Sequence, residues 1–334
     1  MFKKNKKIIL IIVIFIAIIF ISFLLLINKK NEIKIINNIE EEKKVIFKHP
    51  LNGEEVEENY SFFTVAIMLD NSYNIKSQDG LKNADIVYET LVESNITRLL
   101  AIFDSNNKID KIGPIRSARN YFMNWAEEYK GLYMHVGGSP QALNIINNYN
   151  FINIDQIGNN EIYFWRDNNS LAPHNVFTSY SNYLRAGSLK EVENLNKFVF
   201  WNFVDEKGIE NIDDIIIDFS NDYYKVEWKY NNSLEKYQRW QGGDISIYDT
   251  GEQTVADNII VQVVNSYFID EERRGMDNRG EGDLYIFNKL GKQKGKWKYF
   301  NDRTIFIDEE GQNLKLVPGK TWIEVIDSDK KLSS

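Results

Sequence analysis

The chain has 334 residues, a formal net charge of −8 and no cysteine. The lack of cysteine excludes disulfides, thiolate metal sites, a cysteine nucleophile and a lipidated N-terminal cysteine. Because residues 1–30 hold six lysines and no acidic residue, a net charge of −8 leaves −14 for the remainder, which argues against nucleic acid as a partner.

The first segment predicts a membrane anchor. Ile8–Ile27 is a run of twenty residues with Ser22 as its only polar member, and as a helix it spans about 30 Å, the thickness of a bilayer core. Asn28-Lys29-Lys30 follows without a small-residue cleavage site, so we expect an uncleaved signal anchor. The lysines before the span predict that the N-terminal tip stays in the cytoplasm, so residues 1–30 comprise a cytoplasmic tip and the transmembrane anchor. The chain is therefore expected to be a single-pass cell-membrane protein with an extracytoplasmic C-terminal body.

The rest of the chain divides by composition. Residues 31–58 are polar and charged, which predicts a solvated linker. Residues 59–187 mix strand and helix patterns and predict an N-terminal α/β domain. Residues 188–197 read as a connector, and residues 198–328 predict a β-rich antiparallel domain, with a charged loop over Ile269–Asp283 as a rim or lid.

Three strands are expected early in the N-terminal domain, over Phe62–Asp70, Asp85–Glu93 and Thr97–Asp104. Alternation along the second strand places Glu89 and Glu93 on one otherwise apolar face. Two carboxylates on such a face need partners, for which the candidates are Arg98, Arg116 and Arg119.

The stretch from Lys111 to Pro140 is where we expect the functional surface. Gly113-Pro114 predicts the start of a helix that carries Arg116 and Arg119 on one face. A strand over Leu132–Val136 and a Gly137-Gly138 turn then lead to Ser139-Pro140, an N-cap followed by a first-turn proline, so the next helix should run on through Gln141–Asn148. This arrangement places His135 beside a helix N-terminus, which is a natural anion site.

Two loop motifs follow, Phe164-Trp165-Arg166-Asp167 and Ala172-Pro173-His174-Asn175, and Asn175–Arg185 predicts a closing helix. The β-rich part predicts seven strands, at Ile215–Phe219, Tyr223–Tyr230, Ile245–Tyr248, Asn258–Phe268, Leu284–Phe287, Thr304–Ile307 and Lys320–Ile326.

Several short motifs occur in order along the chain: DNS at Asp70–Ser72, ADIVYE at Ala84–Glu89, ITR at Ile96–Arg98, then GPIRSAR, HVGGSP, FWRD and APHN, and PGKTWIEV from Pro318 to Val325. In these motifs the sequence resembles the YerB-like lipoprotein family of bacteria. The resemblance implies an α+β protein, with an N-terminal layered β-β-α sandwich domain and a β-rich C-terminal domain, both of unknown function. The family name implies a lipidated cysteine, which this chain lacks, and the signal anchor takes its place.

The leading hypothesis for a site is an anion or polar-ligand site in the N-terminal domain. A buried salt-bridge network made by the same groups is the open alternative. The candidate residues are Glu89, Glu93, Arg98, Arg116, Arg119, His135, Gly137, Gly138, Ser139, Arg166, Asp167, His174 and Asn175.

Catalytic alternatives are weaker. Ser139, His174 and Asp167 could form a triad, but Pro140 removes the backbone N–H that would build an oxyanion hole, and the spacing is not G-x-S-x-G. Glu89 and Glu93 lie about 13 Å apart along one strand, which is wide for a glycosidase pair. His135 and His174 lack metal-ligand spacing, and we expect no metal or cofactor.

These observations favour an envelope accessory or binding module, whose partner is a cell-wall polymer or an envelope protein. The runner-up is a cofactor-independent hydrolase or transferase acting on wall glycan or phosphate-bearing polymers, with Glu89, Asp167 or His174 as the acid–base group. A third reading is a protein-interaction module without a small-ligand site. The tryptophans are expected in the core rather than as sugar platforms.

Overall fold

The computed structural model describes residues 13–30, 46–149, 151–158, 160–194 and 201–334. It divides into two compact units, Met1–Ile46 and Phe47–Ser334. In the first unit, Val13–Lys30 is a helix of 18 residues with a mean hydropathy of 2.3, apolar and long enough to cross a membrane. Residues 8–12 of the predicted span lie outside the described ranges.

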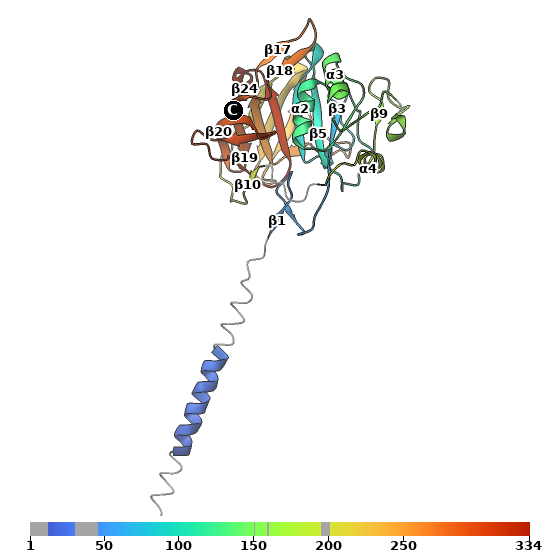
Figure 1. Cartoon of the computed structure of the whole chain (residues 1–334). Coiled ribbons are helices and arrows are strands. Elements are labelled where there is room, and N and C mark those ends of the chain that lie inside the picture. Colours follow the sequence, from blue (N-terminus) through green and yellow to red (C-terminus); the bar gives the residue numbers. More distant parts are fainter. Residues whose placement is uncertain (1–12, 31–45, 150, 159, 195–200) are drawn as a thin grey trace, which may run out of the picture. The chain divides into compact units, whose positions relative to one another are not determined.

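A ten-stranded mixed sheet forms the centre of the second unit (Figure 1). Strands from both ends of this unit meet in it, because β23 pairs with β4 in parallel. Strands β3, β4, β6, β7, β16 and β23 run parallel, whereas β5 is antiparallel to both of its neighbours. In spatial order the strands are β21 (Arg303–Ile307), β20 (Gly291–Phe300), β19 (Glu281–Asn288), β16 (Asn258–Val263), β23 (Thr321–Ile326), β4 (Ile86–Leu91), β5 (Thr97–Asp104), β3 (Thr64–Asp70), β6 (Leu132–His135) and β7 (Asn153–Asp155).

A second, six-stranded sheet packs on one face of the central sheet. Its side chains share a core with alternate residues of β3, β4, β5, β16 and β23, and Trp228 meets Trp322 edge-on at 5.3 Å between ring centres. Both faces of the central strands are covered, which explains why these strands are apolar at nearly every position. The six strands are β14 (Asp244–Ile245), β13 (Lys236–Gln241), β12 (Lys225–Asn231), β11 (Ile215–Asp218), β24 (Leu332–Ser333) and β15 (Val255–Ala256), which pairs with β13.

Helices α2 (Asn120–Glu128) and α3 (Pro140–Asn148) cover the other face, where they lie in front of β3 and β5 in Figure 1. The third helix, α4 (Tyr180–Leu189), packs through Tyr183 and Ala186 on the same side as the six-stranded sheet. The body is therefore an α+β structure with β-β-α layers. The expected α+β fold class is confirmed, and the layers extend across both predicted domains.

Short ladders and single turns complete the body. The ladders are β1 (Phe47–Lys48) with β2 (Glu55–Val56), β8 (Trp165–Arg166) with β9 (Val176–Phe177), β10 (Asn202–Phe203) with β22 (Lys315–Leu316), and β17 (Ser266–Phe268) with β18 (Arg274–Met276). The 3₁₀ turns are Leu81–Asn83, Glu93–Asn95, Glu161–Tyr163, Asp222–Tyr224 and Asp329–Lys331.

The end of the predicted linker belongs to the folded body. Residues 47–56 form a hairpin, and His49 and Leu51 within it are buried. The His49 Nε2 atom lies 2.9 Å from an Asp104 carboxylate oxygen, and its ring stacks on Phe62 at 4.7 Å. These contacts hold a segment that looks polar in sequence, because His49 and Leu51 point inward. Residues 31–45 lie outside the described ranges.

The predicted helix carrying Arg116 and Arg119 is wrong. The segment is extended, since Arg116 N–H donates to the Met68 carbonyl, and Arg119 is the extended N-cap of a helix that begins at Asn120. Backbone pairing with the end of β3 takes the hydrogen bonds that a helix would have used. The proline therefore lies in an extended crossing rather than in a first helical turn.

Further boundaries differ from expectation: the predicted strand Ile245–Tyr248 is a strand only at Asp244–Ile245, and the predicted strand Asn258–Phe268 is divided into β16 and β17. Strand β4 ends at Leu91, and Glu93 opens a 3₁₀ turn in which Ser94 has φ 57°, so Glu89 and Glu93 do not share a face. The predicted helix over Asn175–Arg185 starts only at Tyr180, because Val176 and Phe177 pair with β8. The predicted loop over Ile269–Asp283 contains β18 and the start of β19.

Candidate functional site

Polar side chains gather at one edge of the central sheet. Strands β3, β4, β6 and β23 are parallel, so their carboxyl ends meet there, and Asp70, Glu89, His135 and Glu324 lie in the last halves of these four strands. These four are the buried positions on these mostly apolar strands that carry an acidic side chain or a histidine. In mixed sheets of this kind the carboxyl edge is where ligands usually bind.

A buried ionic network lies between the two sheets. Glu89 and Glu324 are opposite each other in the β4–β23 register, and both are fully buried. Arg239 of β13 reaches them from the second sheet, with its Nη2 atom 2.7 Å from Glu89 Oε2. Its guanidinium also lies over the Trp322 ring at 4.9 Å. One arginine thus serves two adjacent carboxyl groups, so the group can be neutral only if one carboxyl is protonated.

Glu324 is the carboxyl that holds the proton. Burial, together with the neighbouring Glu89 carboxylate, raises the pKa of Glu324 well above its ordinary value. Arg239 and the indole N–H of Trp228, 2.7 Å from Glu324 Oε1, oppose this rise without overcoming it. Glu89 is the carboxyl that makes the direct ion pair, because it accepts from Arg239 and also from Thr97 Oγ1 at 2.8 Å and Asn71 Nδ2 at 2.9 Å.

A cleft of about 560 Å³ opens above this network. Arg239 and Trp322 belong to its floor, and the segment after β3 and the β13–β14 turn form its walls. Gly242 and Gly243 in that turn have φ 61° and 85°, a conformation that favours glycine. The cleft is lined by Asn71, Tyr73, Ile75, Lys76, Gln78, Leu81, Leu99, Tyr223, Arg239, Gln241, Gly242, Gly243, Asp244, Ile245, Ser246, Ile247, Thr254 and Trp322.

The cleft is polar but close to neutral. The charge of Arg239 is balanced by Glu89 beneath it, and Lys76 and Asp244 are of opposite sign. The amide groups of Asn71, Gln78 and Gln241 are joined in a chain, with Nδ2 of Asn71 3.3 Å from Gln241 Oε1 and Nε2 of Gln78 3.2 Å from Asn71 Oδ1. Such amides offer both donors and acceptors without net charge.

Two tyrosines stand at the rim. Tyr73 and Tyr223 are 69% and 63% exposed, and their ring centres are 5.2 Å apart. Backbone contacts fix their positions, since Tyr73 N–H donates to the Tyr224 hydroxyl at 3.1 Å. Exposed aromatic rings beside converging amides are what a ligand with both apolar faces and hydroxyl groups requires.

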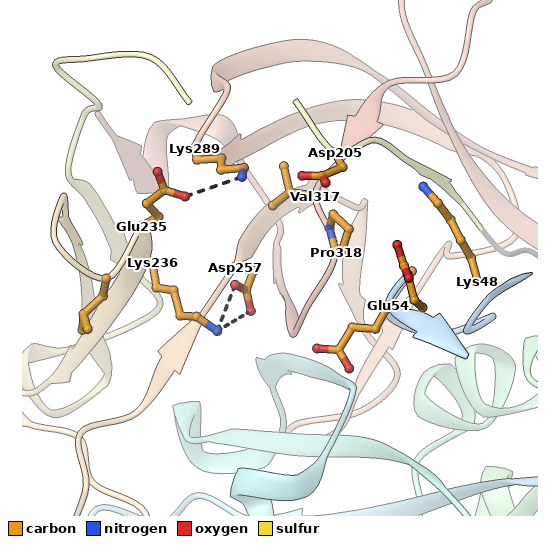
Figure 2. Close-up of a pocket in the computed structure, with 12 residues that line it drawn as sticks. Lys48, Glu54, Asp205, Glu235, Lys236, Asp257, Lys289, Val317 and Pro318 are labelled. Atoms are coloured by element: carbon orange, nitrogen blue, oxygen red, sulfur yellow. Dashed lines mark hydrogen bonds and ion pairs between the residues drawn. The ribbon is translucent and has the colours of Figure 1, made fainter. Parts of the chain in front are cut away.

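A second cavity, of about 390 Å³, lies near the loop before β23 (Figure 2). Its three lysines are already engaged: Lys236 Nζ lies 3.0 Å from Asp257, Lys289 Nζ lies 3.5 Å from Glu235, and Lys48 donates to the Phe203 carbonyl at 2.8 Å. Carboxylates outnumber lysines in the lining. This cavity therefore does not suit an anion, because its lysines are already engaged and its lining carries an excess of negative charge.

The predicted ligand-site residues separate into groups rather than lining one pocket. Arg116 and His174 meet at Asp70, with Arg116 Nε 3.5 Å from Asp70 Oδ2 and His174 Nδ1 bonded to the same oxygen. Close by, Arg166 donates to Asn175 Oδ1 at 2.8 Å, and Asp167 accepts from Lys111 at 2.9 Å.

A second group surrounds Arg119, which binds Glu93 through two parallel hydrogen bonds of 2.5 and 2.6 Å. Gly138 and Ser139 line the same open surface depression, together with residues 270–273. Ser139 caps α3 as expected, accepting from Ala142 N–H at 3.2 Å. Arg98, also buried, donates to the Ser117 carbonyl at 2.8 Å.

His135 is fully buried and satisfied locally, with Nδ1 2.8 Å from the Gly137 carbonyl and Nε2 3.3 Å from Asn153. It does not face the helix N-terminus as an open anion site. Ser139, His174 and Asp167 have different partners and do not assemble as a triad. Glu89 is separated from all three predicted arginines and pairs with Arg239 instead.

Arg239, Glu324 and the rim tyrosines were missed as site residues. Of the five tryptophans expected in the core, Trp201, Trp228 and Trp297 are buried, whereas Trp165 and Trp240 are only half-buried. Glu324 carries a usable signal, because it is a single carboxylate in a run of apolar residues, Trp322–Ile326. Arg239 carries a weaker sequence signal. Buried and half-buried residues alternate along β13, and Arg239 lies on the buried face with Tyr237.

The chain is thus an α+β body of two packed sheets and three helices in its described part, preceded by an apolar helix compatible with membrane anchoring. Models for the N-terminal and C-terminal domains of a protein of unknown function (DUF3048) match residues 51–193 and 215–323. The chain is 30% identical over 286 residues to YerB of Bacillus subtilis (strain 168), a match that covers 84% of this chain and 86% of that protein.

The crystal structure of YerB from Bacillus subtilis superposes with a TM-score of 0.78 at 29% identity, covering 86% of this chain and 99% of the YerB chain. The chain belongs to the YerB-like family. The resemblance drawn from the motifs is therefore confirmed, and the central sheet joins strands from both matched regions.

Proposed function

We propose that this protein is a membrane-anchored, extracytoplasmic binding protein that takes a neutral, hydroxyl-rich saccharide of the cell envelope in the cleft between Asn71, Tyr223 and Gln241. The observation that carries the proposal is the composition of this cleft: converging amides and two exposed tyrosines above an internally neutralised arginine. Hydroxyl groups of a sugar both donate and accept, as do amides, and the apolar faces of sugar rings stack on aromatic side chains.

The location supports the same ligand class. The apolar N-terminal helix would attach the body to the membrane in a single pass, and envelope glycans would be the abundant saccharides within reach. The net negative charge of the chain repels strongly anionic polymers, and the neutral cleft does not offset this repulsion. An uncharged glycan segment is not repelled.

The test uses the full chain in detergent micelles with two probes, an N-acetylglucosamine tetramer and purified wall sacculi. Tyr223→Ala and Gln241→Ala should each raise the Kd for the tetramer about tenfold, which corresponds to about 1.4 kcal/mol. Tyr267→Ala, an exposed tyrosine outside the cleft lining, is the matched control and should bind as the wild type. Wild-type affinity in both cleft variants, or no binding of either probe, would contradict the proposal.

A further inference from the structure

A second group of motif residues lies outside the cleft and meets at Asp70. Three separate chain segments form this cluster. Asp70 ends β3, Arg116 lies in the extended segment after Pro114, and His174 lies in the turn between β8 and β9. Asp70 is 2% exposed, whereas the side chains of Arg116 and His174 are 18% and 24% exposed. A buried carboxylate thus supports two groups that reach solvent.

The geometry fixes the tautomer of His174. Burial alone would raise the pKa of Asp70, but the charge of Arg116 and the hydrogen bonds from Ser72 and His174 outweigh it and lower that pKa below its ordinary value. An ionised carboxylate can only accept, so the Nδ1 atom of His174 carries the proton and donates it to Asp70 Oδ2. The Nε2 atom has no hydrogen-bond partner among the described residues, so in the neutral ring it is the nitrogen that can accept a proton.

Asp70 is itself held rigidly. Its Oδ1 atom accepts from the Ser72 backbone N–H at 3.0 Å and from the Ser72 hydroxyl at 2.6 Å. The turn that carries His174 is held as well, because Arg116 Nη1 donates to the Pro173 carbonyl at 3.2 Å. The Nε atom of Arg116 is buried and has no hydrogen-bond partner within the described chain. It forms an ion pair with Asp70 Oδ2 at 3.5 Å. Rigid support of a base by a second group is the arrangement that proton transfer requires.

The surroundings of this dyad are cationic in an otherwise acidic body. Two guanidinium groups lie beside the single carboxylate of Asp70, that of Arg116 and that of Arg98, which is opposite Asp70 in the β3–β5 register, so one net positive charge remains. Burial, with the charges of Arg119 and Arg116 nearby, lowers the pKa of Arg98 to about 10, a value at which it stays charged at neutral pH. An excess of guanidinium charge selects an anionic substrate, and its planar donors suit phosphate.

We propose that His174, oriented by Asp70 and flanked by Arg116, is the general base of a metal-independent hydrolysis of a phosphate ester. The Nε2 atom takes a proton from water while the water oxygen bonds to phosphorus. The bond from phosphorus to the leaving oxygen breaks, and the proton passes from Nε2 to that oxygen. One water is consumed, and an alcohol and a phosphate with one ester link fewer are formed. This activity does not depend on the saccharide cleft.

The test measures nitrophenol release by the full chain in micelles from bis(p-nitrophenyl) phosphate and p-nitrophenyl phosphate. His174→Asn is the decisive variant, because its amide can still donate to Asp70 but lacks the Nε2 base, so folding should be retained. We expect its rate to fall at least about 100-fold. Release by the wild type no faster than by His174→Asn, with both probes, would overturn the proposal.

Asp70 is a positioning residue, and its role has its own readout. Asp70→Asn should lower the rate and move the acidic limb of the pH–rate profile to lower pH, because the imidazolium loses its carboxylate partner. A purely structural carboxylate would lower the amount of folded protein without moving this limb. An unmoved limb in the folded Asp70→Asn variant would therefore contradict the assigned role.

Discussion

Glu89 and Glu324 lie directly opposite each other on the parallel strands β4 and β23, both fully buried, and the guanidinium of Arg239 bonds to Glu89. Strand β4 comes from the first part of the body and β23 from its last part, and Arg239 contacts Glu89 from the second sheet. Because Glu89 makes the direct ion pair and Glu324 holds a proton, removing the Glu324 carboxyl alone should cost far less stability than removing both carboxyls.

Glu324→Gln should change the free energy of unfolding by no more than about 1 kcal/mol, since it replaces a neutral carboxyl with a neutral amide. The double variant Glu89→Gln, Glu324→Gln should lose about 3–5 kcal/mol, because Arg239 is then a buried charge without a counter-ion. Urea denaturation of the full chain in micelles measures both. Equal losses in the two proteins would show that the proton is not on Glu324.

Arg119 should act in stability rather than in ligand binding. Its side chain is 12% exposed and binds Glu93 through two charged hydrogen bonds, so Arg119→Ala should cost about 2 kcal/mol in unfolding free energy. Binding of the N-acetylglucosamine tetramer should not change. The exposed Arg166→Ala is the control and should shift stability by less than about 0.5 kcal/mol. Weaker binding of the tetramer by folded Arg119→Ala would show that the ligand binds at the arginines predicted from the sequence rather than in the cleft.

Glu128 should make the fold less stable at high pH. Burial raises the pKa of Glu128 to about 7, although Thr304 donates to both carboxylate oxygens. The folded state therefore holds a proton that the unfolded state loses near its ordinary pKa, and stability falls as pH rises from about 4.5 to about 7.

Glu128→Gln removes this titration while keeping an acceptor and adding a donor for Thr304. The variant should match the wild type near pH 4.5 and exceed it by up to about 3 kcal/mol at pH 8, as followed by thermal unfolding. Glu127→Gln, an exposed neighbour, controls for the loss of one negative charge. A difference that does not vary with pH would contradict this assignment.

His49 should hold the first hairpin onto the body. Its ring is 4% exposed and lies between Asp104 and Phe62, so His49→Ala removes an ion-dipole contact and a stacked ring together. Amide exchange over Phe47–Val56 should accelerate at least about tenfold while the central sheet stays protected, because the hairpin opens locally. Glu55→Ala, on the exposed side of the same hairpin, should leave exchange unchanged. Uniform acceleration across the body would indicate global destabilisation instead.

Local patterns predicted the long buried strands of the N-terminal region and the starts of some helices, but they missed β13 and β20. Buried apolar runs gave β3 and β5, and Ser139-Pro140 gave the start of α3, because a capping hydroxyl followed by proline satisfies a helix end without distant help. The helix start predicted at Gly113-Pro114 was wrong because a backbone N–H that follows it, that of Arg116, donates to β3, which is distant in sequence.

The site was beyond local prediction. A carboxylate on an apolar face signals that it needs a partner, and Glu89 gave that signal, but the three nearest arginines in sequence were not that partner. Arg239 reaches Glu89 only because β23 inserts between β16 and β4 and brings the second sheet over this face. Register between strands so distant is set by the packing of whole faces, which no short window of sequence contains.

The amino-acid sequence alone determined the apolar N-terminal helix, the lack of any thiol chemistry, the α+β class and the family, because each rests on composition, periodicity or a short motif. The tertiary structure alone decided which charges meet. It joined both predicted domains in one sheet, gave Arg116 and His174 to Asp70, and placed Asn71, Gln241 and two tyrosines around one cleft. Burial makes a charge need a partner, but only the folded chain brings that partner within hydrogen-bond distance.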